Sequence, residues 1–157
     1  MIIYLDTSSL VKRYCEEEGS EVINALFESA HGLVTSVWTI VETVAAIDKK
    51  VAKRQITEEE RDFALETFFS DLSNRRIILI RFYDEFTPLI ISLVLKHHIS
   101  ADDALQLLSA ITCSPQVFLA SDKKLLESAD KENLRALNPE KEEDAQELLR
   151  IFKVSHN

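Results

Sequence analysis

Glycine is scarce in this chain: only 2 of its 157 residues are glycine. The loops that cradle phosphate in P-loop and dinucleotide-binding proteins need several glycines at fixed spacing. The turn that carries the nucleophilic serine of many hydrolases needs glycine on both sides of it. Gly19 and Gly32 satisfy none of these patterns. The sequence therefore argues against phosphate-cradling loops and against serine-hydrolase chemistry.

Cysteine is equally rare, with Cys15 and Cys113 alone in the sequence. Two widely spaced cysteines are typical of a protein from a reducing compartment rather than of a disulfide scaffold. The histidines show no zinc-type spacing with cysteine or with one another. They are His31, His97, His98 and His156. A zinc site is therefore not expected.

Long apolar runs are missing as well. The longest, LIISLVL, is well short of the ~20 residues that are needed to span a bilayer. The opening MIIYL is too short for a signal peptide and lacks its basic start. We therefore expect a cytoplasmic protein with no membrane partner.

Basic residues are outnumbered by acidic ones, 18 to 27, which leaves a net charge of -9. A charge of this sign argues against broad electrostatic capture of nucleic acid. It still leaves room for a local basic rim around an acidic, metal-filled site.

Short apolar segments alternate with amphipathic ones along the chain. The expected strands are IIYL, GLVTS, IILIRF, VFLAS and, at an edge of the sheet, LRAL. Strands that alternate with helices predict an α/β architecture with a mostly parallel sheet. No linker or repeat divides the sequence, so we expect one domain.

The helix expected after GLVTS has an apolar stripe at core-facing spacing, formed by Val37, Ile40, Val41 and Val44. Ser36 is its expected N-cap. Glu42 lies on this helix beside apolar or small residues, so we expect it to be partly buried. An unpaired buried carboxylate is costly unless a cation neutralises it. The alternative is a glutamate at the surface edge whose stem packs on Trp38.

Two aspartates open a later helix, which Ser100 is expected to cap. Asp103 shares its face with apolar residues, which predicts that it points inward. Asp102 lines up with Gln106 and Ser109, on what we expect to be the polar side. The alternative for Asp103 is a capping box with Ser100.

Two further aspartates, Asp6 and Asp122, stand where expected strands end. In open parallel sheets, ligands bind beyond the carboxyl ends of the strands. Each of the two could instead be no more than the N-cap of the helix that follows it.

These acids can converge at one end of the sheet; the set is Asp6, Glu42, Asp103 and Asp122. Four carboxylates that close cannot all remain charged without a counter-ion. Hard oxygen ligands without histidine or cysteine select Mg²⁺ or Mn²⁺. Such a site commonly performs phosphoryl chemistry, in which one ion activates water and a second stabilises the leaving oxygen. A phosphodiester or phosphomonoester substrate is therefore expected.

Four stretches resemble, in order and spacing, the four acidic motifs of the PIN-domain ribonucleases: YLDTSSLVKRY, SVWTIVETVAA, SADDALQLLSA and VFLASDKKLL. The overall length resembles that of the VapC-type toxins of toxin–antitoxin pairs. The resemblance implies a PIN-like fold with a central parallel five-stranded sheet flanked by helices. It covers residues 1–139, so 140–157 is expected to be a C-terminal helical extension within a single domain of residues 1–157.

The resemblance also implies an activity, that of an endoribonuclease dependent on Mg²⁺ or Mn²⁺. Water bound to metal would attack an RNA phosphate and leave a 3′-hydroxyl and a 5′-phosphate. Homodimers and inhibition by a small VapB-like antitoxin that inserts near the acids are implied as well. The implied catalytic and metal-site acids are Asp6, Glu42, Asp103 and Asp122. The implied supporting hydroxyls are Ser8 and Ser121.

Two positions depart from the family pattern: Ala120 stands where threonine is frequent, and Gln106 where many relatives carry histidine. Basic residues a few positions after the strand-end aspartates could rim the acids and contact substrate phosphates. They are Lys12, Arg13, Lys123 and Lys124. A second basic patch, which is equally well explained as a solvated helix face, comprises Lys49, Lys50, Lys53 and Arg54.

Other classes fit less well. A haloacid-dehalogenase-like phosphatase needs a second acid two residues after the first, where this chain has Ser8. A receiver domain needs its acid pair at the first strand. The remaining alternatives are a non-toxin PIN nuclease in RNA processing and a catalytically inert PIN scaffold for protein binding.

Overall fold

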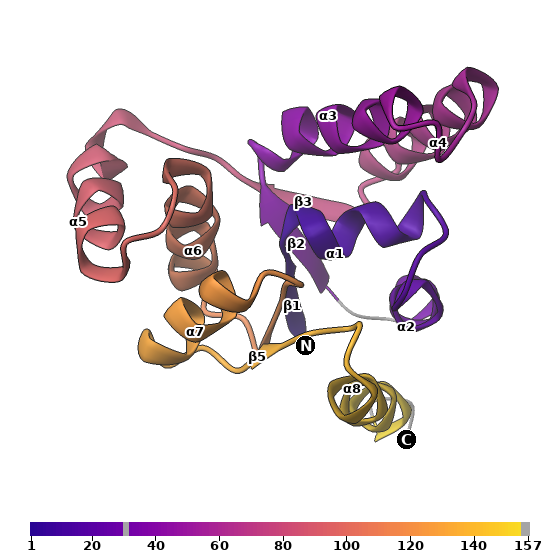
Figure 1. Cartoon of the computed structure of the whole chain (residues 1–157). Helices are drawn as coiled ribbons and strands as arrows, with labels where there is room; N and C mark the ends of the chain where they lie inside the picture. The colour runs from indigo at the N-terminus through magenta and orange to yellow at the C-terminus, as the bar shows by residue number, and fades with distance from the viewer. Residues whose placement is uncertain (30–31, 155–157) are drawn as a thin grey trace.

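Five strands form one sheet in which every neighbouring pair is parallel, as the alternation of elements predicts (Figure 1). The computed structural model describes residues 1–29 and 32–154, so His31, His156 and the end of the predicted extension lie outside it. The strand order is β3-β2-β1-β4-β5. The strands are β1 (Ile2–Leu5), β2 (Gly32–Ser36), β3 (Ile77–Ile80), β4 (Val117–Leu119) and β5 (Ala136–Leu137). The expected edge strand LRAL is confirmed as β5.

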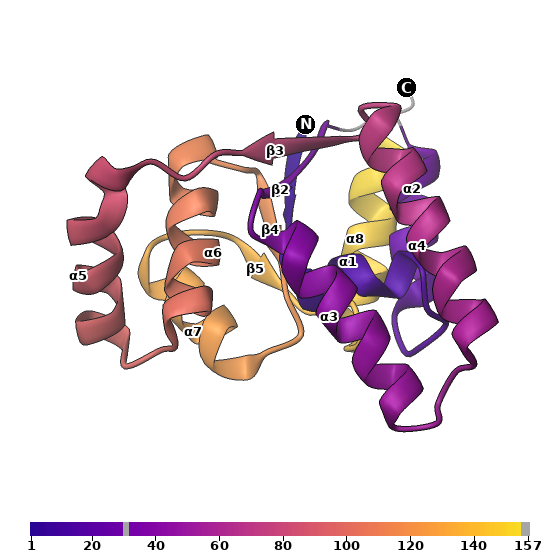
Figure 2. The same ribbon diagram turned by 90° about the horizontal axis from the view of Figure 1, so that it is seen from above.

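Helices cover both faces of this sheet (Figure 2). One layer contains α5 (Thr87–His97), α6 (Ala101–Cys113) and α7 (Lys123–Lys131). The other contains α1 (Thr7–Leu10), α2 (Ser20–Glu28), α3 (Thr39–Ala52), α4 (Glu58–Ser73) and α8 (Glu142–Val154). The short 3₁₀ turns are η1 (Val11–Arg13) and η2 (Asp84–Phe86). The expected arrangement of a parallel five-stranded sheet flanked by helices is therefore confirmed.

Side chains of β1 alternate between the two layers, as the geometry of a strand requires. Ile3 and Leu5 belong to the core under α2 and α4, whereas Tyr4 belongs to the core under α6 and α7. All three are fully buried. A central strand that is covered on both faces explains why IIYL is apolar throughout.

The last helix contributes to the same core. Leu148 and Phe152 of α8 pack in the cluster that holds Val22 and Leu26 of α2, and the two helices lie side by side (Figure 1). The segment after residue 139 therefore adds apolar contacts to the layer that contains α2 and α4. Within residues 1–29 and 32–154, no helix combines the length and apolar character needed to cross a membrane.

The predicted core stripe of α3 is right only in part, because Ile40 and Val44 are partly buried, with Ile40 against the core, but Val37 and Val41 are not. The helix begins at Thr39, and its buried residues are Thr39, Thr43 and Ile47, whereas Val37 and Val41 are 37% and 57% exposed. Hydrogen bonding explains why α3 buries its threonines, because the hydroxyls of Thr35 and Thr39 lie 2.8 Å apart in the buried contact between β2 and α3. The predicted cap is also displaced.

Ser36 ends β2 and caps the turn before α3 rather than α3 itself. Its hydroxyl accepts a hydrogen bond from the Trp38 N–H at 3.2 Å, and Trp38 occupies the N-cap position without a side-chain cap. By contrast, the Thr57–Glu60 capping box at the start of α4 is complete, and Ser100 caps α6. Helix starts that carry a local sequence signature were therefore easier to locate than the face that a helix buries.

Gly19 occupies a position where only glycine fits well. Its φ is +87°, and a Cβ atom there would lie 2.8 Å from the backbone oxygen of Pro139. A left-handed conformation costs a residue with a side chain about 1–2 kcal/mol. The contact with rigid backbone adds to that cost.

We expect Gly19→Ala to lower the free energy of unfolding by about 2 kcal/mol or more, measured by urea denaturation. Gly32→Ala is the matched control, because a Cβ atom there would meet its nearest neighbour, the Met1 oxygen, at an ordinary 3.6 Å. Equal destabilisation by the two substitutions would contradict this account of Gly19.

Candidate active site

Asp6 follows β1 directly and is 6% exposed. Its Oδ2 accepts hydrogen bonds from the backbone N–H of Ser8 at 3.0 Å and from the Ser8 hydroxyl at 2.6 Å. Burial raises the pKa of Asp6 to about 6, the hydrogen bonds from Ser8 oppose this shift, and the charge of Glu42 adds to it. Asp6 is thus an N-cap, as its alternative interpretation held, and also a strained buried acid that a cation would stabilise.

Glu42 lies in the first turn of α3 and is half-buried. Its Oε2 accepts hydrogen bonds from the Thr7 hydroxyl at 2.8 Å and from the Gln106 amide at 2.5 Å. Burial raises the pKa of Glu42, and the charges of Asp102 and Asp103 raise it further. The carboxylate is therefore held by polar partners. Trp38, on which the alternative interpretation packs the stem of Glu42, is 45% exposed.

Asp122 caps a helix, and Asp103 is bonded to the residue that caps one; both lie near the other acids. The Ser100 hydroxyl donates to Asp103 Oδ2 at 2.7 Å and accepts from the Asp103 N–H at 3.2 Å. Burial raises the pKa of Asp103, with further contributions from Asp102 and Asp122. Asp122 is exposed and caps α7, where its Oδ1 accepts from the Leu125 N–H at 2.8 Å.

The negative charges of neighbouring acids contribute to the raised pKa values: that of Glu42 acts on Asp6, that of Asp103 on Glu42, and that of Asp122 on Asp103, each less than burial does. They therefore share one electrostatic neighbourhood at the carboxyl ends of β1 and β4. Among the residues that the structure describes, no three His, Cys, Asp or Glu side chains stand close enough together to hold one metal ion. The side chains share an electric field here without forming a closed ligand cage.

The chemistry of these donors fits a hard divalent cation, because all are carboxylate oxygens. Three of the acids have one oxygen held by the chain. Within the described residues, the other oxygen accepts no hydrogen bond; these atoms are Glu42 Oε1, Asp103 Oδ1 and Asp122 Oδ2. One fixed and one available oxygen is an arrangement that can orient a metal ligand.

Ser8 joins the first acidic segment to the fourth. Its hydroxyl donates to Asp6 and accepts from the backbone N–H of Ser121 at 2.9 Å. The Asp6 N–H itself donates to the Leu119 carbonyl at 2.9 Å. The contribution of Ser121 that these bonds define therefore comes from its backbone, which holds the loop after β4 against the loop after β1.

Three uncharged residues beside Glu42 were not predicted as site residues. Gln106, which was expected on the polar side of α6 with Ser109, is 1% exposed, and Ser109 is 8% exposed. That expectation is wrong because both faces of α6 are covered. The signal was present in ALQLLSAI, a run without charge that is typical of a helix buried on all sides. The residues missed are Thr7, Thr39 and Gln106.

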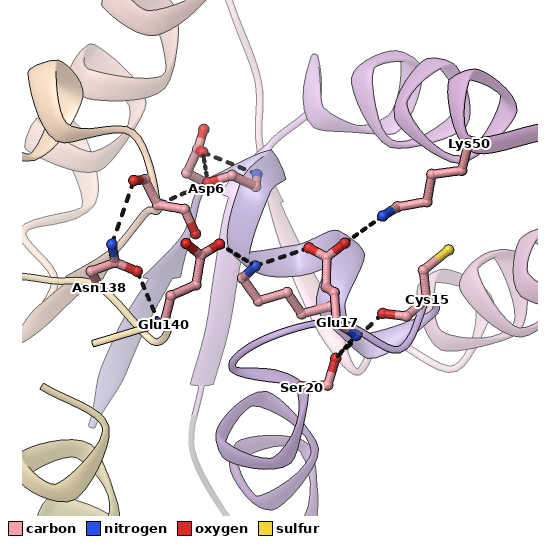
Figure 3. A network of polar contacts seen from close by, with 10 residues as sticks. Asp6, Cys15, Glu17, Ser20, Lys50, Asn138 and Glu140 are labelled. Carbon is pink, nitrogen blue, oxygen red and sulfur yellow. Dashed lines mark hydrogen bonds and ion pairs between the residues drawn. The ribbon is translucent and has the colours of Figure 1, made fainter. Parts of the chain in front are cut away.

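Lys12 does not lie on the rim where it was expected. It is 2% exposed, and its ammonium contacts Glu17 Oε1 at 2.9 Å and Glu140 Oε1 at 2.6 Å. Lys50 contacts the other oxygen of Glu17 at 2.5 Å (Figure 3). Burial acts to raise the pKa of Glu17, but the hydrogen bonds from Lys50 and Lys12 outweigh it and hold that pKa below its usual value.

This ion network reaches the acids through a short series of hydrogen bonds. The Glu140 N–H donates to Asn138 Oδ1 at 2.9 Å, and the Asn138 amide contacts the Ser121 carbonyl at 3.5 Å (Figure 3). Ser121 in turn meets Ser8, the partner of Asp6. Lys12 therefore supports the loops that carry the site instead of facing a substrate.

Of the other three basic residues, one faces the protein interior and two lie at the surface. Arg13 faces inward to Asn24, at 2.9 Å, and stacks over Phe27, away from the acids. Lys123 and Lys124 are exposed beside the N-cap Asp122. The Lys124 ammonium donates to the His98 carbonyl, and Lys123 forms a 3.8 Å ion pair with Glu127, but both contacts lie at the surface and not in the core.

We expect Lys12→Met to lower the free energy of unfolding by about 2–3 kcal/mol, because it leaves the partly buried Glu140 without its cation. Lys123→Met is the matched control, since Lys123 is 89% exposed and its ion pair with Glu127 is 3.8 Å long. Surface pairs of this kind contribute little. Urea denaturation measures both. A Lys12 variant as stable as the Lys123 variant would show that the buried network is dispensable.

Several solved structures have the same fold. PAE2754 from Pyrobaculum aerophilum has a TM-score of 0.66 at 13% identity, over 96% of this chain and 88% of that one. VapBC2 from Rickettsia felis, bound to a DNA fragment from its promoter, has 0.61 at 19% identity, over 88% and 98%. FitAcB from Neisseria gonorrhoeae has 0.54 at 18% identity, over 87% and 97%. At such identities the likeness establishes the fold alone.

Sequence comparison gives the family. No curated protein matches the chain significantly. The family model for the PIN domain matches residues 3–132, which include all four acidic segments. PIN domains are generally nucleases. The chain, by this match and by its fold, belongs to the PIN-domain family.

Proposed function

We propose that this protein is an endoribonuclease dependent on Mg²⁺ or Mn²⁺, and the toxin of a toxin–antitoxin pair. The observation that carries the proposal is the set of four acids at the carboxyl edge of a PIN-family sheet, three of which have raised pKa values. Three of these acids have raised pKa values, so the protein itself does not neutralise their charge. A divalent cation would do so.

The acids that would hold the cation, directly or through water, are Asp6, Glu42, Asp103 and Asp122. A bound Mg²⁺ or Mn²⁺ lowers the pKa of water and stabilises charge on phosphate oxygens. Ser8 orients Asp6, and Thr7 orients Glu42 through a 2.8 Å hydrogen bond. The hydroxyl of Ser121 is retained in the proposal as a supporting group.

Lys123 and Lys124 are the basic residues that we assign to the phosphates of the RNA. They are exposed and lie directly after Asp122, so they could position a backbone without reading its sequence. Lys12 and Arg13 are withdrawn from this role, because their charged groups face Glu140 and Asn24.

We expect the wild-type protein to cleave single-stranded RNA with Mg²⁺ or Mn²⁺ and to leave a 3′-hydroxyl and a 5′-phosphate. Asp6→Asn should lower the rate by on the order of a hundredfold, because it removes a charged ligand but keeps the N-cap. Gel electrophoresis of end-labelled RNA measures both the rate and the end groups. Asp130→Asn, an exposed aspartate of α7, is the control and should cleave like the wild type.

Two results would refute the nuclease. One is equal cleavage by the wild type and by Asp6→Asn, and the other is cleavage that survives EDTA. If neither protein cleaves RNA, calorimetric titration with Mn²⁺ tells a metal-binding protein from a catalytically inert scaffold. A catalytically inert scaffold should show no binding that depends on the acids.

The proposed partner is a small VapB-like antitoxin. The fold likeness to VapBC2, and to FitAB bound to a DNA fragment, supports this choice. An apolar groove opens beside the acids and could receive the antitoxin; it is lined by Trp38, Val41, Glu42, Ala45, Phe82, Ala101, Asp102 and Leu105. The homodimer stays part of the proposal, and exposed apolar side chains of α5, such as Leu89 and Leu95, could be covered in it.

We expect a small protein encoded immediately upstream to co-purify with this chain and to abolish its RNA cleavage. Val41→Asp should weaken that complex, because Val41 is 57% exposed in the groove and a buried unpaired charge is costly. Co-expression followed by pull-down measures the complex. A genome without such a reading frame would favour a nuclease of RNA processing instead.

A further inference from the structure

Gln106 is a buried amide that meets four polar side chains. It lies in the middle of α6 and is 1% exposed. Its partners come from three other elements, β1, α1 and α3; they are Tyr4, Thr7, Thr39 and Glu42. A single side chain therefore links the central strand to helices of both layers.

The orientation of this amide follows from its partners. The Tyr4 hydroxyl donates to Gln106 Oε1 at 2.6 Å. On the other side stands the Glu42 carboxylate, which only accepts hydrogen bonds when it is ionised. The amide nitrogen must therefore face Glu42, and it lies 2.5 Å from Oε2.

Tyr4 is itself immobilised. It is fully buried, and its ring stacks on Phe118 with centroids 5.5 Å apart. Gln106 is thus held from behind by a rigid phenol and held in front against Glu42. The Thr39 hydroxyl, 2.9 Å from the amide nitrogen, blocks sideways movement.

A neutral donor suits this position better than a charged one. A carboxylate at position 106 would repel Glu42, and an ammonium would compete with a cation for it. The amide neutralises nothing, so the negative charge of Glu42 stays available. Both Gln106 and Thr7 bond to Oε2, while Oε1 accepts no hydrogen bond within the described part of the chain.

We propose that Gln106 is a positioning residue, which holds Oε2 of Glu42 so that Oε1 is presented to the divalent cation of the site. The inference rests on the proposed function. It gives a role to the residue that departs from the family pattern, and it makes the Tyr4–Gln106–Glu42 series part of the site. Groups that orient a metal ligand typically change metal affinity 10–100-fold when they are removed.

The test compares Mn²⁺ binding by calorimetry for the full chain and its variants. Gln106→Met keeps the length of the side chain but loses the hydrogen bonds of the amide to its four partners, and should weaken Mn²⁺ binding by about tenfold or more. Tyr4→Phe should weaken binding by less, since the contact to Glu42 remains. Ser128→Ala is the control, because it removes a buried hydroxyl of α7 that bonds only within its helix.

Two further readouts separate positioning from a structural role. The midpoint of thermal unfolding in EDTA should fall further for Gln106→Met than for Ser128→Ala, because the buried Tyr4 hydroxyl loses its acceptor; both variants should still be folded at the temperature of the titration, so that lost binding there is not lost structure. In RNA cleavage, excess Mn²⁺ should restore kcat of Gln106→Met to within a few-fold of the wild type, with KM for RNA unchanged. If Gln106→Met does not fold, Thr7→Val tests the same carboxylate from its other donor and should also weaken Mn²⁺ binding.

The outcomes are distinguishable. Wild-type Mn²⁺ affinity in Gln106→Met, together with lost affinity in Glu42→Gln, overturns the role of Gln106 and leaves the proposed nuclease intact. Weakened binding in a protein that cleaves no RNA supports the positioning role and overturns the nuclease. A wild type that binds no Mn²⁺ overturns both.

Discussion

The parallel pairing of β1 with β2 on one side and with β4 on the other determines at which edge of the sheet the acids lie. Because these strands run in one direction, they end at one edge of the sheet, and the chain turns into a helix beyond each of them. Asp6 and Asp122 stand in those turns. The backbone bond from Asp6 to the Leu119 carbonyl, at 2.9 Å, sets their separation. Glu42 and Asp103 reach the same edge from helices in opposite layers, so the neighbourhood exists only in the folded chain.

Capping and proposed metal binding do not compete in these acids. A capping aspartate presents one oxygen to a backbone N–H and keeps the other free. Asp122 does this at the start of α7, whereas one oxygen of Asp103 accepts a hydrogen bond from the hydroxyl of Ser100, the residue that caps α6. The helix start thereby fixes the carboxylate at little cost in side-chain entropy. An N-cap interpretation and a site interpretation of one aspartate can thus both hold.

Local signatures predicted much of this molecule, and long-range contacts account for the failures. The strands, the Ser100 cap and the family motifs each occupy a few consecutive residues, so they could be predicted directly. The face that α3 buries could not, because apolar periodicity does not reveal that Thr39 finds a hydroxyl partner in β2. Gln106 was misplaced because its partners lie up to 102 residues away. Lys12 was placed at the surface because Glu140, its counter-charge, lies 128 residues further along the chain.

The segment that follows the family-matched residues 3–132 has a consequence for how such domains are delimited. It supplies Glu140 to the buried ammonium of Lys12, and Leu148 and Phe152 to the core beneath α2. A polypeptide ended where homology stops would leave one carboxylate for Lys12 and uncover apolar surface on α2. The family match therefore ends before the contacts of the fold do, and a minimal version of this protein should be delimited by those contacts.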